Sequence, residues 1–198
     1  MIRVAFLDDH PAVREGLEAI VSREPDLQPV GFAADEEAVW PLLRRTRPEV
    51  VVLDVHHRGR DGLALCLQIK RDIHAPRVVL YSASTDDLLL VAAAVAGADA
   101  VVDKSAPARA LLQAIRGTED GPPLAARITP MVQAEAAAAL DPADRPILAM
   151  RLAATAPADI AQTLGLTLNE LLGRIATMIR TAVHNRRQVI PAFEGHRP

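Results

Sequence analysis

The chain has 198 residues, of which 50% are hydrophobic, and a formal net charge of −3 at pH 7. This length favours two small domains over one large one. No apolar run is long enough to cross a bilayer, and residues 1–7 are too few for a signal-peptide core, so we expect a cytoplasmic protein without membrane contact. The single cysteine, Cys66, stands between two leucines, which indicates a buried thiol.

The charge is distributed unevenly along the chain. Residues 1–120 contain 14 Lys and Arg against 19 Asp and Glu, whereas residues 121–198 contain 8 against 6. The first part is therefore acidic (−5) and the second weakly basic (+2), which indicates different partners for the two parts. Such a small basic excess permits nucleic-acid binding without arguing strongly for it.

In the first 120 residues, short runs rich in β-branched residues alternate with longer amphipathic stretches. This alternation predicts an α/β fold with a doubly wound, five-stranded parallel sheet. The expected strands are Ile2–Leu7, Leu27–Ala33, Val50–Asp54, Arg77–Ser82 and Ala100–Asp103. Helices are expected over residues 11–22, 35–45, 62–72, 86–96 and 106–116, with caps at Ser84, Thr85 and Ser105.

The second part of the chain has helical patterns only. Glycine, acidic residues and two prolines in residues 117–123 stop the preceding helix and predict a domain boundary. A connecting helix is expected over residues 129–140, followed by helices over residues 142–153, 157–164 and 168–183. The predicted organisation is a first domain over residues 1–118, a linker with a connecting helix over 119–140 and a smaller, all-α domain over 141–198.

Polar side chains follow four of the predicted strands. Asp8 and Asp9 come directly after the first strand, Asp54 closes the third, Ser82 ends the fourth and Lys104 follows the fifth. The carboxyl ends of parallel strands form one edge of the sheet, where ligands bind. Three carboxylates there would repel one another unless a divalent cation neutralised them, and Mg²⁺ is the natural candidate. With Ser82 and Lys104 holding phosphoryl oxygens, this edge would suit phosphoryl transfer to a carboxylate.

These residues resemble the receiver domain of two-component response regulators, which has a flavodoxin-like fold. The resemblance covers residues 1–118. It is carried by Phe6-Leu7-Asp8-Asp9-His10, Val51-Val52-Leu53-Asp54, Leu80-Tyr81-Ser82-Ala83 and Gly97-Ala98-Asp99-Ala100 leading to Asp103-Lys104.

The resemblance implies a role for each matching residue. Asp54 would accept a phosphoryl group from a histidine kinase. Lys104 would pair with the phosphate, and Ser82 would close toward it once Asp54 is modified. The ligands of Mg²⁺ would be Asp8 (through water), Asp9, Asp54 and the backbone carbonyl of His56.

Two places depart from the usual family pattern. His57 and Arg58 stand where the family usually has Met-Pro, which could alter Mg²⁺ affinity and the lifetime of the phosphate. Val101 occupies the fifth-strand position of the usual switching Tyr or Phe, so phosphorylation cannot move a ring there. Tyr81, beside Ser82, is a candidate substitute.

Residues 88–98, around the fourth helix, contain no charged or strongly polar side chain. Since a surface helix should have a polar face, we expect this helix to pack against another surface, either a second receiver or the helical tail. The alternative is that alanine is simply favoured here as a helix former.

Residues 140–193 resemble the tetrahelical output domain of NarL/LuxR-type regulators, with a helix-turn-helix and Thr167 as the cap of its second helix. This resemblance implies DNA binding, but two residues would weaken it. Glu170 would be repelled by DNA phosphates, and Leu172 stands where the family commonly has a basic residue. Pro191 interrupts the final helix, so a homodimer would rely on the receiver. The predicted DNA-binding residues are Thr167, Asn169, Arg174, Arg180, Arg186 and Arg187.

The predicted function is that of a response regulator, not an enzyme, that a histidine kinase phosphorylates on Asp54 and that controls transcription through DNA. One alternative is a regulator that works without phosphorylation or through a protein partner, with weak or no DNA binding. Another is a phosphatase-like enzyme with Asp54 as nucleophile. The lack of a second catalytic acid close behind Asp54 speaks against the enzyme, since Asp61 belongs to the following turn.

Overall fold

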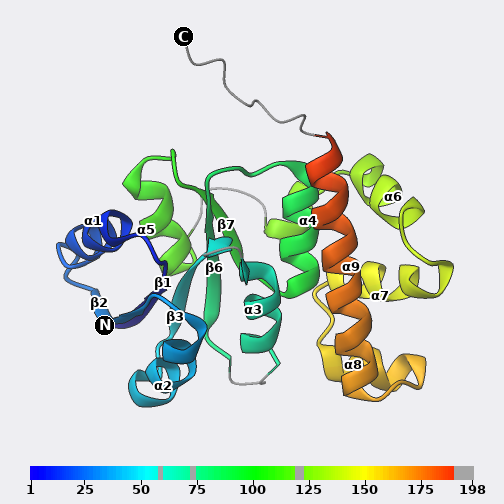
Figure 1. The fold of residues 1–198 in the computed structure, drawn as a ribbon, viewed down its shortest axis with the longest axis horizontal. Coiled ribbons are helices and arrows are strands. Elements are labelled where there is room, and N and C mark those ends of the chain that lie inside the picture. The colour runs from blue at the N-terminus through cyan, green and yellow to red at the C-terminus, as the bar shows by residue number, and fades with distance from the viewer. Residues whose placement is uncertain (58–59, 72–74, 119–122, 190–198) are drawn as a thin grey trace, which may run out of the picture.

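The computed structural model describes residues 1–57, 60–71, 75–118 and 123–189. A parallel sheet runs through the first part, and the helices of the second part pack against the helices that cover one face of this sheet (Figure 1). The strand order is β2-β1-β3-β6-β7, which is the flavodoxin-like order with its switch point between β1 and β3. All five expected strands are confirmed: β1 Ile2–Leu7, β2 Leu27–Ala33, β3 Val50–Asp54, β6 Arg77–Ser82 and β7 Ala100–Asp103.

Helices cover both faces of this sheet, as expected for a doubly wound fold. Leu17 of α1 and Ile115 of α5 pack with Phe6 on one face, and Val39 of α2 and Cys66 of α3 pack with the residues of the other face. The helix bounds are α1 Pro11–Val21, α2 Glu36–Thr46, α3 Gly62–Ile69, α4 Asp87–Ala96 and α5 Ala108–Arg116. A short antiparallel pair, β4 His56–His57 with β5 Arg60–Asp61, was not expected from the sequence.

The tail is helical throughout its described part, residues 123–189. It consists of η1 Leu124–Arg127, α6 Pro130–Ala138, η2 Pro142–Asp144, α7 Arg145–Leu152, α8 Pro157–Leu164 and α9 Leu168–Val189. The helix expected over residues 142–153 is divided, because Pro146 has no N–H group and belongs in the first turn of a new helix. The connecting helix is shorter than expected at both ends, and α9 extends six residues past the expected end at residue 183.

The expected helix caps in the first part are wrong. The carboxylate of Asp86, directly before α4, accepts the bond from the backbone N–H of Leu89 at 3.0 Å. The Ser84 hydroxyl instead donates to Asp86. α5 begins after Pro107 without a side-chain cap, and Ser105 donates to Asp103. At α4 the carboxylate of Asp86 accepts the helix N–H in place of a serine hydroxyl. Before α5 the Ser105 hydroxyl is itself a donor, to the carboxylate of Asp103.

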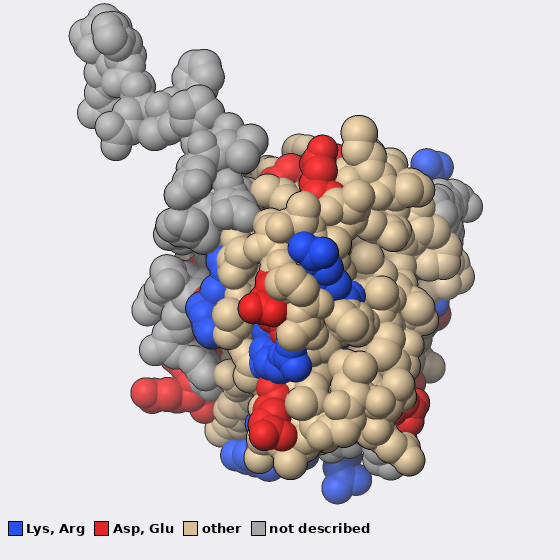
Figure 2. All heavy atoms as spheres, turned by 90° about the vertical axis from the view of Figure 1, so that its right-hand side faces the viewer, with Lys and Arg blue, Asp and Glu red and all other residues tan. Residues whose placement is uncertain are grey.

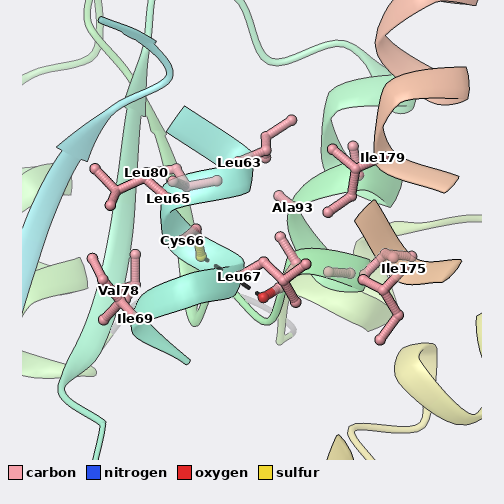
Figure 3. Close-up of a cluster of buried hydrophobic side chains, with 14 of the residues drawn as sticks. Leu63, Leu65, Cys66, Leu67, Ile69, Val78, Leu80, Ala93, Ile175 and Ile179 are labelled. Atoms are coloured by element: carbon pink, nitrogen blue, oxygen red, sulfur yellow. Dashed lines mark hydrogen bonds between the residues drawn. The ribbon is translucent and has the colours of Figure 1, made fainter. Parts of the chain in front are cut away.

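α4 is buried on every side. Its residues from Leu89 to Ala96 are all buried, and the helix contacts α3 on one side and α6, α7 and α9 of the tail on the other. Figure 3 shows Leu67 of α3, Ala93 of α4 and Ile175 of α9 in one apolar cluster. The expected packing of this helix is therefore confirmed, with the tail as its partner.

A buried arginine joins the end of α4 to the tail. Arg151 of α7 is 8% exposed, and its Nε donates to the carbonyl of Val95 at 2.9 Å, while Nη1 donates to the carbonyl of Thr155. Gly97 ends α4 at φ 92°, a left-handed conformation that favours glycine. A Cβ atom at Gly97 would also lie 2.5 Å from Nη2 of Arg151, so a larger residue would displace the guanidinium in addition to straining the backbone.

Among the described residues, no helix combines the length and the apolar character needed to cross a membrane.

The thiol of Cys66 should be chemically inert in the folded protein. Its side chain is fully buried between β6 and α4, and burial raises its pKa to about 12, so it remains protonated at neutral and mildly alkaline pH. Since only the thiolate is nucleophilic, we expect a disulfide reagent such as Ellman's reagent to leave the native protein unmodified and to react fully after unfolding in guanidinium. Equal reaction rates in the two states would contradict this.

Candidate functional site

Carboxylates meet at the carboxyl edge of the sheet, as predicted from the strand ends. β1 and β3 are adjacent strands. Asp8 and Asp9 follow β1, and Asp54 is the last residue of β3. One ligand atom from each of Asp8, Asp9, His10 and Asp54 lies within 4.8 Å of all the others. Asp8 and Asp54 are only 4% and 3% exposed, so their charges are screened little by water.

Lys104 neutralises part of this cluster. Its Nζ lies 3.0 Å from Oδ2 of Asp8 and 2.9 Å from Oδ2 of Asp54. Burial alone would lower the pKa of Lys104, but hydrogen bonds to Asp54 and Asp8 outweigh burial and raise the pKa above its usual value. The ammonium also lies 5.6 Å from the centre of the Tyr81 ring. Lys104 is therefore a permanent cation beside Asp54.

Ser82 lies at the same edge of the sheet. Tyr81 is the register partner of Asp54 between β3 and β6, so Ser82 is one residue further toward the edge. Its side chain is fully buried, and its Oγ accepts a bond from the backbone N–H of Ser84 at 3.3 Å. The structure thus brings Asp8, Asp9, Asp54, Ser82 and Lys104 to one edge.

His10 belongs to the cluster and was missed as a site residue by the sequence reasoning. Its Nδ1 lies 3.0 Å from Oδ1 of Asp8 and 3.0 Å from Oδ1 of Asp9, and its backbone N–H donates to Asp8 at 2.8 Å. The ring is 61% exposed, so it lies at the mouth of the site. The one available signal was its position directly after two aspartates at a strand end.

The donor set fits Mg²⁺. Asp8, Asp9 and Asp54 offer carboxylate oxygens, the ligands that this hard cation prefers, within the 4.8 Å span of the cluster. His56 lies in β4 directly after this edge, and the participation of its backbone carbonyl stays a prediction. Of the residues that depart from the family pattern, His57 lies in β4, Val101 lies in β7, and Arg58 lies outside the described residues.

The cap predicted at the start of α9 is confirmed. The backbone N–H of Glu170 donates to the Thr167 hydroxyl at 3.2 Å, and the backbone N–H of Thr167 donates back to the Glu170 carboxylate at 2.8 Å. This reciprocal pair is a capping box. The capping box explains why a glutamate stands at position 170, although its carboxylate would repel DNA phosphates.

The other predicted DNA-binding residues do not form a common basic surface in the described part of the chain. Asn169 accepts a bond from Arg71 of the receiver at 3.3 Å, and Arg174 donates to Asp144 of η2 at 2.5 Å. Arg180 is exposed and donates to the Thr177 hydroxyl. At Arg186 and Arg187 only the backbone is described, as part of α9, so their predicted contacts lie outside the described side chains.

Leu172, at the position where the family commonly has a basic residue, is buried in this structure. It is 8% exposed and belongs to the large apolar cluster that contains residues of α4 and α9. Figure 2 shows the side of the molecule on which the tail helices lie, and its few basic side chains are mixed with acidic ones. The described residues of that face therefore form no continuous positive surface for a phosphate backbone.

Comparison with known proteins identifies the first part of the chain. Residues 4–116 match the response regulator receiver domain. The transcriptional regulatory protein LiaR of Bacillus subtilis is 32% identical over 123 residues, which is 62% of this chain and 58% of LiaR. VraR of Staphylococcus aureus is 28% identical over 120 residues, or 61% of this chain and 57% of VraR. The chain thus spans less than two thirds of the length of these relatives.

Solved structures extend the similarity to the tail. A LuxR-family two-component response regulator from Aurantimonas is 31% identical, with a TM-score of 0.56, over 68% of this chain and 94% of that one. RcsB of Salmonella enterica bound to the rprA promoter is 19% identical, with a TM-score of 0.59, over 97% of this chain and 94% of that one, which shows a shared fold. The chain therefore belongs to the response regulators, with a receiver domain followed by a helical region of the LuxR type.

Proposed function

We propose that this response regulator accepts a phosphoryl group on Asp54 from a histidine kinase and passes the signal to transcription through its tail. The observation that carries the proposal is the position of Asp54, nearly buried at the end of a central strand and 2.9 Å from the Lys104 ammonium. The domain division at residues 1–118, 119–140 and 141–198 is part of the proposal.

The chemistry needs a nucleophile and a means of balancing charge. A carboxylate oxygen of Asp54 forms the new bond to phosphorus, while the bond from phosphorus to the donor group breaks and the donor leaves with that electron pair. Asp8, Asp9 and Asp54 would hold Mg²⁺, which supplies charge neutralisation for the transferred group when bound. Lys104 supplies a second positive charge at the same place.

A chain of contacts leads from Ser82 to α4. The Ser82 hydroxyl holds the backbone of Ser84, whose own hydroxyl donates to Asp86, the cap of α4. A Ser82 hydroxyl that turns toward a phosphoryl group on Asp54 gives up its bond with Ser84. The start of α4 then loses part of its support, and the packing of α9 on α4 changes with it.

In this proposal α9 contacts DNA after it separates from the receiver, through Thr167, Asn169, Arg174, Arg180, Arg186 and Arg187, in a homodimer. The similarity to RcsB, whose structure was solved on a promoter, supports this proposal. Separation is needed because Asn169 contacts Arg71 of the receiver and Leu172 is buried while the tail is docked.

A second candidate is a regulator whose tail acts on a protein partner and not on DNA. It is favoured by the Arg174–Asp144 pair, which already uses one of the predicted reading residues within the tail. The buried Leu172 favours it too, because that position offers no charge to DNA in either arrangement.

Phosphorylation can be tested directly. Incubation with acetyl phosphate and Mg²⁺ should add one phosphate to the wild type and none to Asp54→Asn, as measured by intact-protein mass spectrometry. The control Asp159→Asn, at an exposed position on α8 far along the chain from the cluster, should be modified like the wild type. An unmodified wild type, or an Asp54→Asn variant modified to the same extent, would overturn the proposal.

The role of Lys104 can be separated from that of Mg²⁺. Lys104→Ala leaves Asp8 and Asp54 without their shared ammonium, so without divalent cations the free energy of unfolding should fall by about 1.5–3 kcal/mol. Mg²⁺ should recover most of this loss, because a cation bound to the native state stabilises it. The control Lys70→Ala breaks the Lys70–Asp99 pair on another edge and should gain nothing specific from Mg²⁺. Thermal unfolding with and without Mg²⁺ measures the stability of both variants. An equal gain in stability from Mg²⁺ in the two variants would contradict the placement of Mg²⁺ beside Lys104.

DNA binding can be tested with gel shifts of mixed-sequence duplex DNA across salt concentrations. The phosphorylated chain should bind more tightly than the unphosphorylated one, and its affinity should fall as salt rises, because phosphate contacts release counterions. Arg180→Ala should reduce the salt slope by about one, whereas Arg14→Ala, at an exposed position on α1, should leave it unchanged. The absence of salt-dependent binding in both states would favour the protein-partner alternative.

A further inference from the structure

A cavity of about 480 Å³ lies between the receiver and the tail. It is lined by one face of α4, by residues between 135 and 140 at the end of α6 and directly after it, by residues between 178 and 182 in the middle of α9, and by Leu148 of α7. This volume falls in the range of about 300–1,000 Å³ that is typical of small-molecule pockets. The residues of the phosphorylation site do not line it.

Small side chains leave this space open. Ala92 of α4, Ala136 of α6, Ala139 directly after α6 and Ala182 of α9 all line the cavity, where larger residues would fill it. Water inside would meet mostly hydrocarbon and could make few of the hydrogen bonds that ordered water needs. An apolar molecule that displaced this water would therefore be favoured.

The polar groups of the lining restrict the chemistry of the occupant. Among the described lining residues, Glu135 is the charged one, and it lies at an exposed position of α6. The Thr181 hydroxyl donates to the carbonyl of Thr177 at 3.1 Å, so its remaining hydrogen-bonding capacity is as an acceptor. Both side chains can thus accept a hydrogen bond from a ligand, and the carboxylate would repel an anion. The lining is complementary to a cationic donor attached to an apolar body.

We propose that this cavity binds one small amphipathic amine, with its alkyl part between α4 and α9 and its ammonium group at Glu135. Because the lining comes from both the receiver and the tail, such a ligand binds the docked arrangement better than a separated one. Binding therefore stabilises the docked tail by mass action. This inference is independent of phosphorylation at Asp54.

Three chain-matched probes test the head-group preference on the full-length protein: octylamine, 1-octanol and octanoate, each below its aggregation limit. Isothermal titration should give one site for octylamine and at least about tenfold weaker binding for octanoate, because like charges in close contact are costly. Glu135→Gln should weaken octylamine binding and bring it close to that of 1-octanol. Octylamine should also raise the midpoint of thermal unfolding of the wild type.

Cavity-filling variants test the location. Ala136→Leu combined with Ala139→Leu should abolish binding of octylamine while the far-ultraviolet circular dichroism stays that of the wild type. The matched control, Ala134→Leu, adds the same side chain to an exposed position of α6 outside the lining and should bind like the wild type. If the double variant loses its fold, Ala139→Leu alone, at an exposed position on the rim, replaces it with the same expectation.

Each possible outcome of these experiments either supports or contradicts the proposed amine site. Octanoate binding as tight as octylamine, more than one octylamine per chain, or unchanged binding in the filled variant would each overturn the proposal. An unmodified Asp54 in the acetyl phosphate experiment would leave this proposal standing, because the two sites share no residue.

Discussion

The burial of α4 on all sides is the constraint on which the rest of the arrangement depends. A helix of a doubly wound sheet normally presents one face to water, yet the eight residues from Leu89 to Ala96 are all buried here. Burying a single Leu or Val side chain contributes about 1.5–3 kcal/mol, so a receiver without its tail would expose a costly apolar surface. The apolar cluster that contains α4 accordingly includes both Leu53 of the sheet and Ile175 of the tail.

This constraint gives α9 two competing uses. Docked on α4, it buries Ile175 and Ile179 and shares the Asn169–Arg71 bond with the receiver. Contact with DNA would require the same helix to leave that surface. A phosphoryl group on Asp54 can change the balance only through contacts that differ between the two arrangements. The β6–α4 segment is suited to this, because Ser82 lies at its beginning and the cap of α4 at its end.

The sheet and the acidic edge could be predicted from the sequence because both follow from short-range patterns. Most of the buried parallel strands are apolar runs, and the site residues stand at or directly after the ends of four of them, as Asp54 does at the end of Val50–Asp54. The pairing of His56–His57 with Arg60–Asp61 could not be predicted, since strands of two residues have no periodicity. His10 was missed because a turn, held by its backbone bond to Asp8, brings its ring to the cluster.

Contacts between helices were less predictable still. The Arg174–Asp144 pair depends on how α9 crosses η2, and the burial of Leu172 depends on how the helices of the cluster pack around α9. Both residues look like solvent-facing positions in the sequence of an isolated helix. The apolar composition of α4 predicted that another surface covers this helix, because such a composition is unusual for a surface helix. Which segment packs there could be named only from the structure.

Arg151 explains how an apolar contact of this kind acquires a single geometry. Apolar surfaces of leucine and alanine can slide past one another with little change in buried area, so they stabilise docking without fixing its register. The Arg151 guanidinium is nearly buried, and burial lowers its pKa. It donates to the backbone carbonyls of Val95 and Thr155. Carbonyls at a helix C-terminus carry partial negative charge, which favours a cation there. Since a buried guanidinium adds little net stability over its solvation in water, its effect is selective: any other register would separate the guanidinium from the carbonyl of Val95 on α4. The apolar face of α4 therefore supplies the free energy of docking, and Arg151, in the space left by Gly97, determines where the tail binds.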